Sequence, residues 1–255
     1  ERLIFEQFLE KLKEAGLVKQ RGKMRTDSTH ILAQVQRLSQ LELVTESLRV
    51  ALRATVQVAA PWAEQALPAT LLGAYNERVH EYRLSKDTVG ERLIEAGQDG
   101  FWFLAQVDRS APDKVRELPE VATLRTVLAQ QFPEGPNAPP ARRPTGRDVI
   151  ETPHEVDARW GRKRDKLWLG YKAQVTETCD EDRPRLITDL EVTGATDNDH
   201  VELSAIQGRL EEQKTLPGEQ QVDKGYVSGE NLAKSVEKGI ELVGIPPADA
   251  GSAEG

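Results

Sequence analysis

The pattern of apolar residues divides the chain into a helical first part and a strand-rich last part. Near the N-terminus, apolar residues recur three and four positions apart, as in an amphipathic helix: Leu3, Ile4, Phe5, Phe8, Leu9 and Leu12. Gly16 ends this pattern. The same spacing extends from residue 31 to residue 58, which predicts one long helix or two, ended by Pro61.

More helices are predicted before the pattern changes. A helix is expected at 67–83, and another at 121–132, where Pro119 suits a first helical turn. Thr88 and Glu91 have the spacing of a capping box and predict the start of a further helix. The first half of the chain is therefore expected to be mainly helical.

The segment between the first two helical patterns is different. Residues 17–26 are predicted to be extended, so that Asp27 would stand where this extended segment stops. Asp27-Ser28-Thr29 fits either a helix N-cap or a loop of a functional site. Taken alone, Asp27 favours the N-cap interpretation.

A proline-rich linker separates the helical part from the strand-rich part. Its prolines are Pro133, Pro136, Pro139, Pro140 and Pro144. Beyond it, apolar residues alternate with polar ones, which predicts the clearest strand of the chain: Leu167, Leu169, Tyr171, Ala173 and Val175. A second strand at 186–192 would form a hairpin with it.

The remaining elements alternate between helix and strand. Helices are predicted at 201–213 and from the Ser228 cap to Gly239, and strands at 220–223 and 240–245. Just before the first of these helices stand Asp197, Asp199 and His200, which could bind a metal but fit a polar turn with an N-cap better. Asp223 ends the strand at 220–223.

Composition narrows the class of protein. The 255 residues are 30% charged and 38% hydrophobic, with a net charge of −8 and one cysteine, Cys179. This balance fits a globular protein without a disulfide framework and argues against uniform attraction to nucleic acid. We find no apolar run of membrane-spanning length and no signal segment, so we expect a cytoplasmic protein without a membrane partner.

Without the helical block, the predicted order is three strands, a helix, a strand, a helix and a strand. The first three would form an antiparallel meander, and the last two would join a mixed sheet through right-handed crossovers. In such a sheet Asp27 and Asp223 can lie on neighbouring strands. Aspartates at strand ends are suitable ligands for hard divalent cations.

This order resembles the DDE-type transposases of bacterial insertion sequences, which have a ribonuclease-H-like catalytic core. The resemblance covers nearly the whole chain and rests on four motifs: Arg25-Thr26-Asp27-Ser28-Thr29-His30, Ala158-Arg159-Trp160-Gly161-Arg162-Lys163-Arg164 leading into Trp168-Leu169-Gly170-Tyr171-Lys172, Thr176-Glu177-Thr178-Cys179-Asp180, and Val222-Asp223-Lys224-Gly225-Tyr226. It implies an α/β fold, a ribonuclease-H-like mixed sheet with an α-helical insertion after the first strand.

The resemblance also implies a site and a reaction. Asp27 and Asp223 would be the first and second catalytic aspartates and would hold two Mg²⁺ (or Mn²⁺) ions for cleavage and transfer of DNA strands at insertion-sequence ends. The partners would be double-stranded DNA, both transposon ends and target, and a second copy in a homodimer. Residues expected to orient the site are Thr26, Ser28, His30, Lys224 and Tyr226.

The family completes its metal site with a glutamate on a later helix. No residue here matches that glutamate, so we expect either a chain cut short before it or a decayed copy.

Basic and aromatic residues near the linker suggest a surface for DNA, although intervening acidic residues also fit a solvated, salt-bridged hairpin. The candidates for contacting nucleic acid are Arg159, Arg162, Lys163, Arg164, Lys166, Lys172, Trp160 and Trp168. Three parts are expected: 1–37 with the first helix and strand, 38–149 with the helical insertion and linker, and 150–255 with the rest of the core.

Two other functions remain open. One is a non-catalytic DNA-binding or oligomerisation fragment of a decayed transposase, and the other is an unrelated metal-dependent phosphoesterase.

Overall fold

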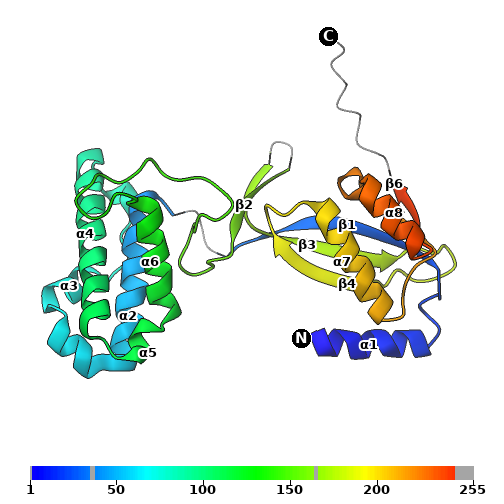
Figure 1. Ribbon diagram of the computed structural model, residues 1–255, viewed down its shortest axis with the longest axis horizontal. Coiled ribbons are helices and arrows are strands. Elements are labelled where there is room, and N and C mark those ends of the chain that lie inside the picture. The colour runs from blue at the N-terminus through cyan, green and yellow to red at the C-terminus, as the bar shows by residue number, and fades with distance from the viewer. Residues whose placement is uncertain (1, 35–37, 164–165, 245–255) are drawn as a thin grey trace, which may run out of the picture. The chain divides into compact units, whose positions relative to one another are not determined.

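The computed structural model describes residues 2–34, 38–163 and 166–244. The chain divides into two compact units (Figure 1). The sheet unit combines Glu1–Leu32 with Gly161–Gly255, and the helical unit is Ala33–Trp160. The sequence placed the corresponding boundaries at 38 and 149.

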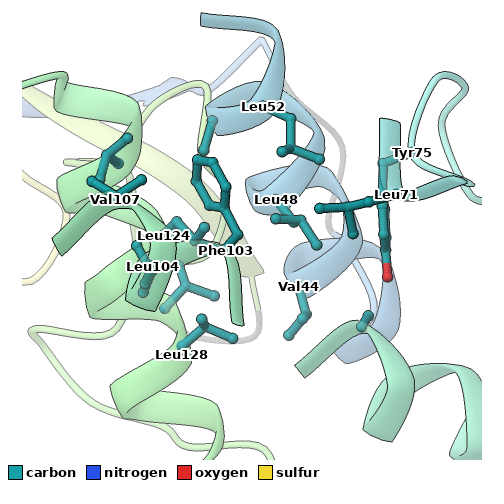
Figure 2. Close-up of a cluster of buried hydrophobic side chains, with 14 of the residues drawn as sticks. Val44, Leu48, Leu52, Leu71, Tyr75, Phe103, Leu104, Val107, Leu124 and Leu128 are labelled. Atoms are coloured by element: carbon teal, nitrogen blue, oxygen red, sulfur yellow. The ribbon is translucent and has the colours of Figure 1, made fainter. Parts of the chain in front are cut away.

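The helical unit is built on three long helices that pack around one apolar core. Leucines from α2, α4 and α6 meet there, together with the fully buried Phe103 of α4 (Figure 2). The elements of this unit are α2 (Gln40–Ala66), α3 (Ala69–Ala74), η1 (Glu81–Arg83), α4 (Lys86–Ser110), α5 (Asp113–Arg116) and α6 (Pro119–Gln131).

Local signals explain where these helices begin. Ser39 caps α2 and forms a reciprocal capping box with Glu42, and Ser85 caps α4 by accepting a hydrogen bond from the Thr88 amide. The predicted Thr88–Glu91 capping box is therefore wrong, although the helix that it announced is present. Pro119 occupies the first turn of α6, as predicted.

Two predictions in this unit need correction. Pro61 does not end α2, which continues to Ala66. Instead, the helix has a kink at Ala59, two residues before the proline, where the backbone is not helical (φ −146°, ψ 48°). The helix predicted at 67–83 is reduced to α3 and η1, with turns between them.

The sheet unit contains a mixed sheet whose central strand is β3. β3 pairs antiparallel with β1 on one side and with β4 on the other, and β1 then runs parallel to β5 and β5 parallel to β6. β2 borders β3 in the same sheet. The strands are β1 (Lys23–Leu32), β2 (Arg159–Lys163), β3 (Lys166–Thr178), β4 (Ile187–Gly194), β5 (Glu219–Val222) and β6 (Glu241–Gly244).

Helices α7 (Asp199–Glu212) and α8 (Gly229–Glu237) connect β4 to β5 and β5 to β6. Within the described residues the chain thus has eight α-helices and six strands, an α/β fold with a mixed sheet. The strands predicted after the linker are confirmed, as are α7 and the Ser228 cap of α8. The helix α1 (Arg2–Glu14) is also confirmed and lies beside β4, where Arg2 pairs with Glu191 at 3.3 Å.

The largest error of the sequence analysis concerns β1. This strand begins at Lys23 and continues through Asp27 to Leu32, so Asp27-Ser28-Thr29 is neither a helix N-cap nor a loop. The reason is tertiary: every residue from Met24 to Leu32 is paired with β3. The helix predicted from residue 31 accordingly starts only at Gln40, and residues 35–37 lie outside the described part.

The two faces of the sheet differ in an unexpected way. The face under α7 and α8, here called the covered face, buries polar side chains such as Thr26, Gln174 and Thr176. The opposite face, here called the open face, leaves Leu190 and Val192 about half exposed. The alternation of β3 and β4 is real, but the polar positions are the more deeply buried ones.

Candidate functional site

Asp27 lies on β1, and Asp223 directly follows the neighbouring parallel strand β5, at an equivalent position. In the register of β1 with β5, Thr26 is the partner of Val222, and each aspartate is the next residue. Parallel strands are about 4.8 Å apart, so carboxylates at such positions can approach a common ion. Asp223 follows the last residue of β5, with extended backbone (φ −66°, ψ 158°), and begins the short helix η2 (Lys224–Tyr226).

Both carboxylates are exposed and belong to the open face. Thr26 and Val222 pack toward the covered face, and side chains alternate along extended backbone, which directs Asp27 and Asp223 the other way. A shallow depression of about 220 Å³ lies at Asp27, lined also by Arg25, Val175 and Glu177. Arg25 is bound to Glu177 by an ion pair beside it.

The pKa of Tyr226 is affected by the negative charges of this region. Its hydroxyl is fully buried and donates a hydrogen bond to Oε1 of Gln174. Burial raises the pKa of Tyr226 far above its ordinary value, and the charges of Asp199, Asp27 and Asp223 raise it further. Both candidate aspartates therefore lie within electrostatic reach of one buried phenol.

Asp199, at the start of α7, binds side chains of the two neighbouring strands β1 and β3. Its Oδ1 accepts hydrogen bonds from Lys172 Nζ at 3.1 Å and from Gln174 Nε2 at 3.3 Å. Its Oδ2 accepts one from Ser28 Oγ at 3.2 Å. Asp199 was predicted to belong to a polar turn, and here its carboxylate is the centre of a network.

A second set of buried polar side chains crosses the sheet next to the aspartates. Thr176 and Thr26 share a hydrogen bond of 2.8 Å, and Gln220 Nε2 donates to Thr26 Oγ1 at 2.8 Å. Gln207 of α7 then donates to Gln220 Oε1 at 2.9 Å and to Ser235 Oγ of α8 at 2.8 Å. We call these five side chains the buried polar chain.

The predicted site-orienting residues divide into two groups. Thr26, Ser28 and Tyr226 take part in the two networks, as just described. His30 is exposed and its ring lies 5.2 Å from the ring of Trp168, and Lys224 is exposed beside Asp223.

Several residues proposed to contact DNA are used inside the protein. Trp168 is only 5% exposed and donates from Nε1 to the Tyr171 carbonyl, so its ring is not presented to a base. Lys172 is bound to Asp199, and Arg159 donates to the backbone carbonyls of Arg147 and Ala158.

Other members of that set remain at the surface or outside the description. Lys166 and Arg162 are exposed, Trp160 is partly exposed, and Arg162 and Trp160 each make a further contact. Arg164 and the side chain of Lys163 lie outside the described residues.

The donor set suits a hard divalent cation but is small. Mg²⁺ is commonly bound by one or two carboxylates, with water and substrate phosphate completing its shell, which Asp27 and Asp223 can satisfy. In the part of the chain that the structure describes, no group of three or more His, Cys, Asp or Glu side chains could hold a metal. Among the described residues, the predicted two-ion site therefore has no third ligand of these types beside Asp27 and Asp223.

Gln174 and Gln220 are the residues that the sequence analysis missed. Gln174 belongs to the polar half of an alternating strand, and such residues usually face solvent. The only signal for a different role is that the polar residues at the alternate positions Gln174, Thr176 and Thr178 are all uncharged.

Comparison with known proteins gives no relative: no family model, no curated protein and no solved structure matches this chain. Within the described residues, none of the helices combines the length and apolar character needed to cross a bilayer.

Proposed function

We propose that this protein is the catalytic core of a DDE-type transposase with a ribonuclease-H-like fold, which cleaves and transfers DNA strands with the help of divalent cations. The observation that carries the proposal is the register of β1 with β5, in which Asp27 and Asp223 follow the paired residues Thr26 and Val222. The strand order, with two crossover helices between β4 and β6, supports it further.

The chemistry requires oxygen ligands that remain ionised and can be reached by a phosphodiester. Asp27 and Asp223 are exposed, whereas Asp199, a carboxylate close by, is neutralised by Lys172. A divalent cation bound by the two aspartates supplies activation of water or a 3′-hydroxyl and neutralises charge on the phosphate. The protein's own part is to hold the carboxylates at a fixed spacing and to leave the open face accessible to DNA.

The test is nicking of a supercoiled plasmid that carries this gene with its flanking DNA, in Mg²⁺ or Mn²⁺. We expect nicking that requires the cation and falls more than about 100-fold in Asp27→Asn and in Asp223→Asn. Removal of a direct metal ligand should reduce activity more than removal of a group that only supports a ligand. Asp182→Asn, an exposed aspartate in the β3–β4 turn, removes the same charge and should retain activity. Nicking that survives in both site variants contradicts the proposal.

A second function is favoured by the small donor set: a DNA-binding fragment without catalysis. With two carboxylates and no third His, Cys, Asp or Glu ligand among the described residues, cleavage could be absent while binding persists. This alternative predicts salt-dependent binding to duplex DNA that is unchanged in Asp27→Asn and Asp223→Asn, with no nicking by the wild-type chain.

A further inference from the structure

The carboxylate of Asp199 is positioned between the two segments that carry the candidate metal ligands. On one side it accepts from Ser28, the residue that follows Asp27. On the other side it lies close to η2, the segment that follows Asp223, since a Cβ added to Gly225 would lie 3.2 Å from Asp199 Oδ2. One side chain of α7 thus bonds to β1 and lies close to η2, next to the residues Asp27 and Asp223.

Asp199 is itself held in place from β3. Lys172 Nζ bonds to Oδ1 of Asp199 and also to the backbone carbonyl of Asp197, at 2.6 Å. Gln174 donates to the same Oδ1 and accepts from Tyr226 of η2. Gln174 and Tyr226 are almost fully buried, so these bonds have little competition from water.

These contacts also argue against Asp199 as a direct ligand of the cation. Both of its carboxylate oxygens accept hydrogen bonds, and a lysine compensates its charge, so it is a poor third ligand for a cation. Groups that hold a ligand without touching the metal are commonly needed for affinity, because they fix the ligand's orientation.

We propose that Asp199 is a positioning residue, which sets the spacing of Asp27 and Asp223 by tying β1 to the Lys172–Gln174 pair of β3 and by packing beside η2, which Tyr226 ties to the same Gln174. The inference rests on the proposed function in so far as the spacing serves metal binding. The tie between the two segments can be measured without any metal.

A buried ion pair in the same unit provides a matched control. Asp189 of β4 pairs with Arg209 of α7 at 2.6 Å, and its carboxylate is more deeply buried than that of Asp199. Loss of Asp189 also weakens the packing of α7 on the sheet, but β4 is separated from β1 by β3. It therefore removes stability without touching the segments that bear Asp27 and Asp223.

The first measurement is hydrogen–deuterium exchange of the full chain without metal. We expect Asp199→Ala to accelerate exchange in Ser28–His30 and Lys224–Val227 by about tenfold or more relative to Asp189→Ala. If the alanine variant folds poorly, Asp199→Asn replaces it. Asparagine keeps the size of the side chain and some of its hydrogen bonds, so a smaller acceleration of exchange is expected. Equal exchange in these segments for the Asp199 and Asp189 variants overturns the proposal.

The second measurement is Mn²⁺ affinity, followed by electron paramagnetic resonance of the free ion. We expect a loss of about 10- to 100-fold in Asp199→Ala, the range known for groups that support a ligand, and an unchanged affinity in Asp189→Ala. The double variant Asp27→Asn, Asp223→Asn lacks both proposed ligands. If the wild-type chain binds Mn²⁺ no better than this double variant, the proposed function fails, while hydrogen–deuterium exchange still decides the role of Asp199. If the wild type binds and Asp199→Ala binds equally well, only the positioning role is lost.

Discussion

At the scale of single residues, Tyr226 shows how closely the site depends on neutral hydrogen bonds. Its phenol is enclosed and donates to Gln174, and three nearby carboxylates oppose its ionisation. The protonated phenol is therefore the form that the folded protein selects, far into the alkaline range.

Replacement of Tyr226 by phenylalanine should destabilise the sheet unit by about 1–3 kcal/mol, because Oε1 of Gln174 would be buried without a donor. Urea unfolding measures this change. Tyr82→Phe is a suitable control, since Tyr82 is 77% exposed and should change stability by less than about 0.5 kcal/mol. Equal effects of the two substitutions would show that the Tyr226 hydroxyl has no structural role.

The same side chain predicts a pH dependence. Tyrosine in the unfolded chain loses its proton near pH 10, whereas the pKa of folded Tyr226 is higher, so stability is full below pH 10 and falls as pH rises beyond it. Tyr75 of the helical unit has a pKa raised by burial and by Asp99, and contributes a slope of the same sign. The Tyr226→Phe variant should therefore show a shallower alkaline loss than the wild type.

At the scale of elements, two glycines of α4 have opposite environments. A Cβ on Gly97 would lie 2.4 Å from the ring of Phe132, which is buried at the end of α6, whereas nothing lies within 4 Å of a Cβ on Gly90. The approach of α4 to α6 thus depends on the missing side chain of Gly97.

This contrast yields two substitutions of opposite sign. Gly90→Ala should stabilise the helical unit by about 0.5–1 kcal/mol, the usual gain in a helix interior. Gly97→Ala should instead destabilise it by about 1–3 kcal/mol, because the core would be overpacked. Thermal unfolding of both variants checks the prediction, and stabilisation by Gly97→Ala would contradict the packing described for α4 and α6.

Elements were predictable from the sequence where the signal is local. The alternation of β3, the proline in the first turn of α6 and the Ser228 cap of α8 each act within a few residues. β1 was misplaced because its last residues are strand only through their pairing with distant β3. The predicted strand order allowed the strands of Asp27 and Asp223 to be neighbours, and the register of β1 with β5 confirms that they are.

The site was only partly visible for a related reason. Asp27 and Asp223 stand in recognisable motifs, but Asp199 looks like any acidic residue at the start of a helix, and Gln174 like any polar residue of a half-exposed strand. Their roles depend on which face α7 covers, and this is decided by the whole sheet unit.

At the scale of the whole molecule, the two units have cores of very different size. The core of the helical unit includes residues of α2, α3, α4, α5 and α6, whereas the sheet unit has a small apolar cluster around Met24, Leu203 and Ile206. Much of the remaining interior of the sheet unit is the buried polar chain.

Calorimetry should accordingly resolve two unfolding transitions. Thr26→Val removes the hydroxyl that joins Thr176 to Gln220. It should therefore reduce the free energy of unfolding of the sheet unit by about 1–3 kcal/mol and lower only the transition temperature of that unit. Gly97→Ala should lower only that of the helical unit. A single transition that both substitutions shift together would show that the units unfold as one.

The buried polar chain has a consequence for how such a sequence can change. Insertion or deletion of one residue in β1 before Thr26 would turn the Asp27 carboxylate toward Leu203 and Ile206 and move Thr26 to the open side, leaving Gln220 and Thr176 unmatched. The lineage of this protein can therefore accept length variation in its loops, but hardly in the few residues on either side of Thr26.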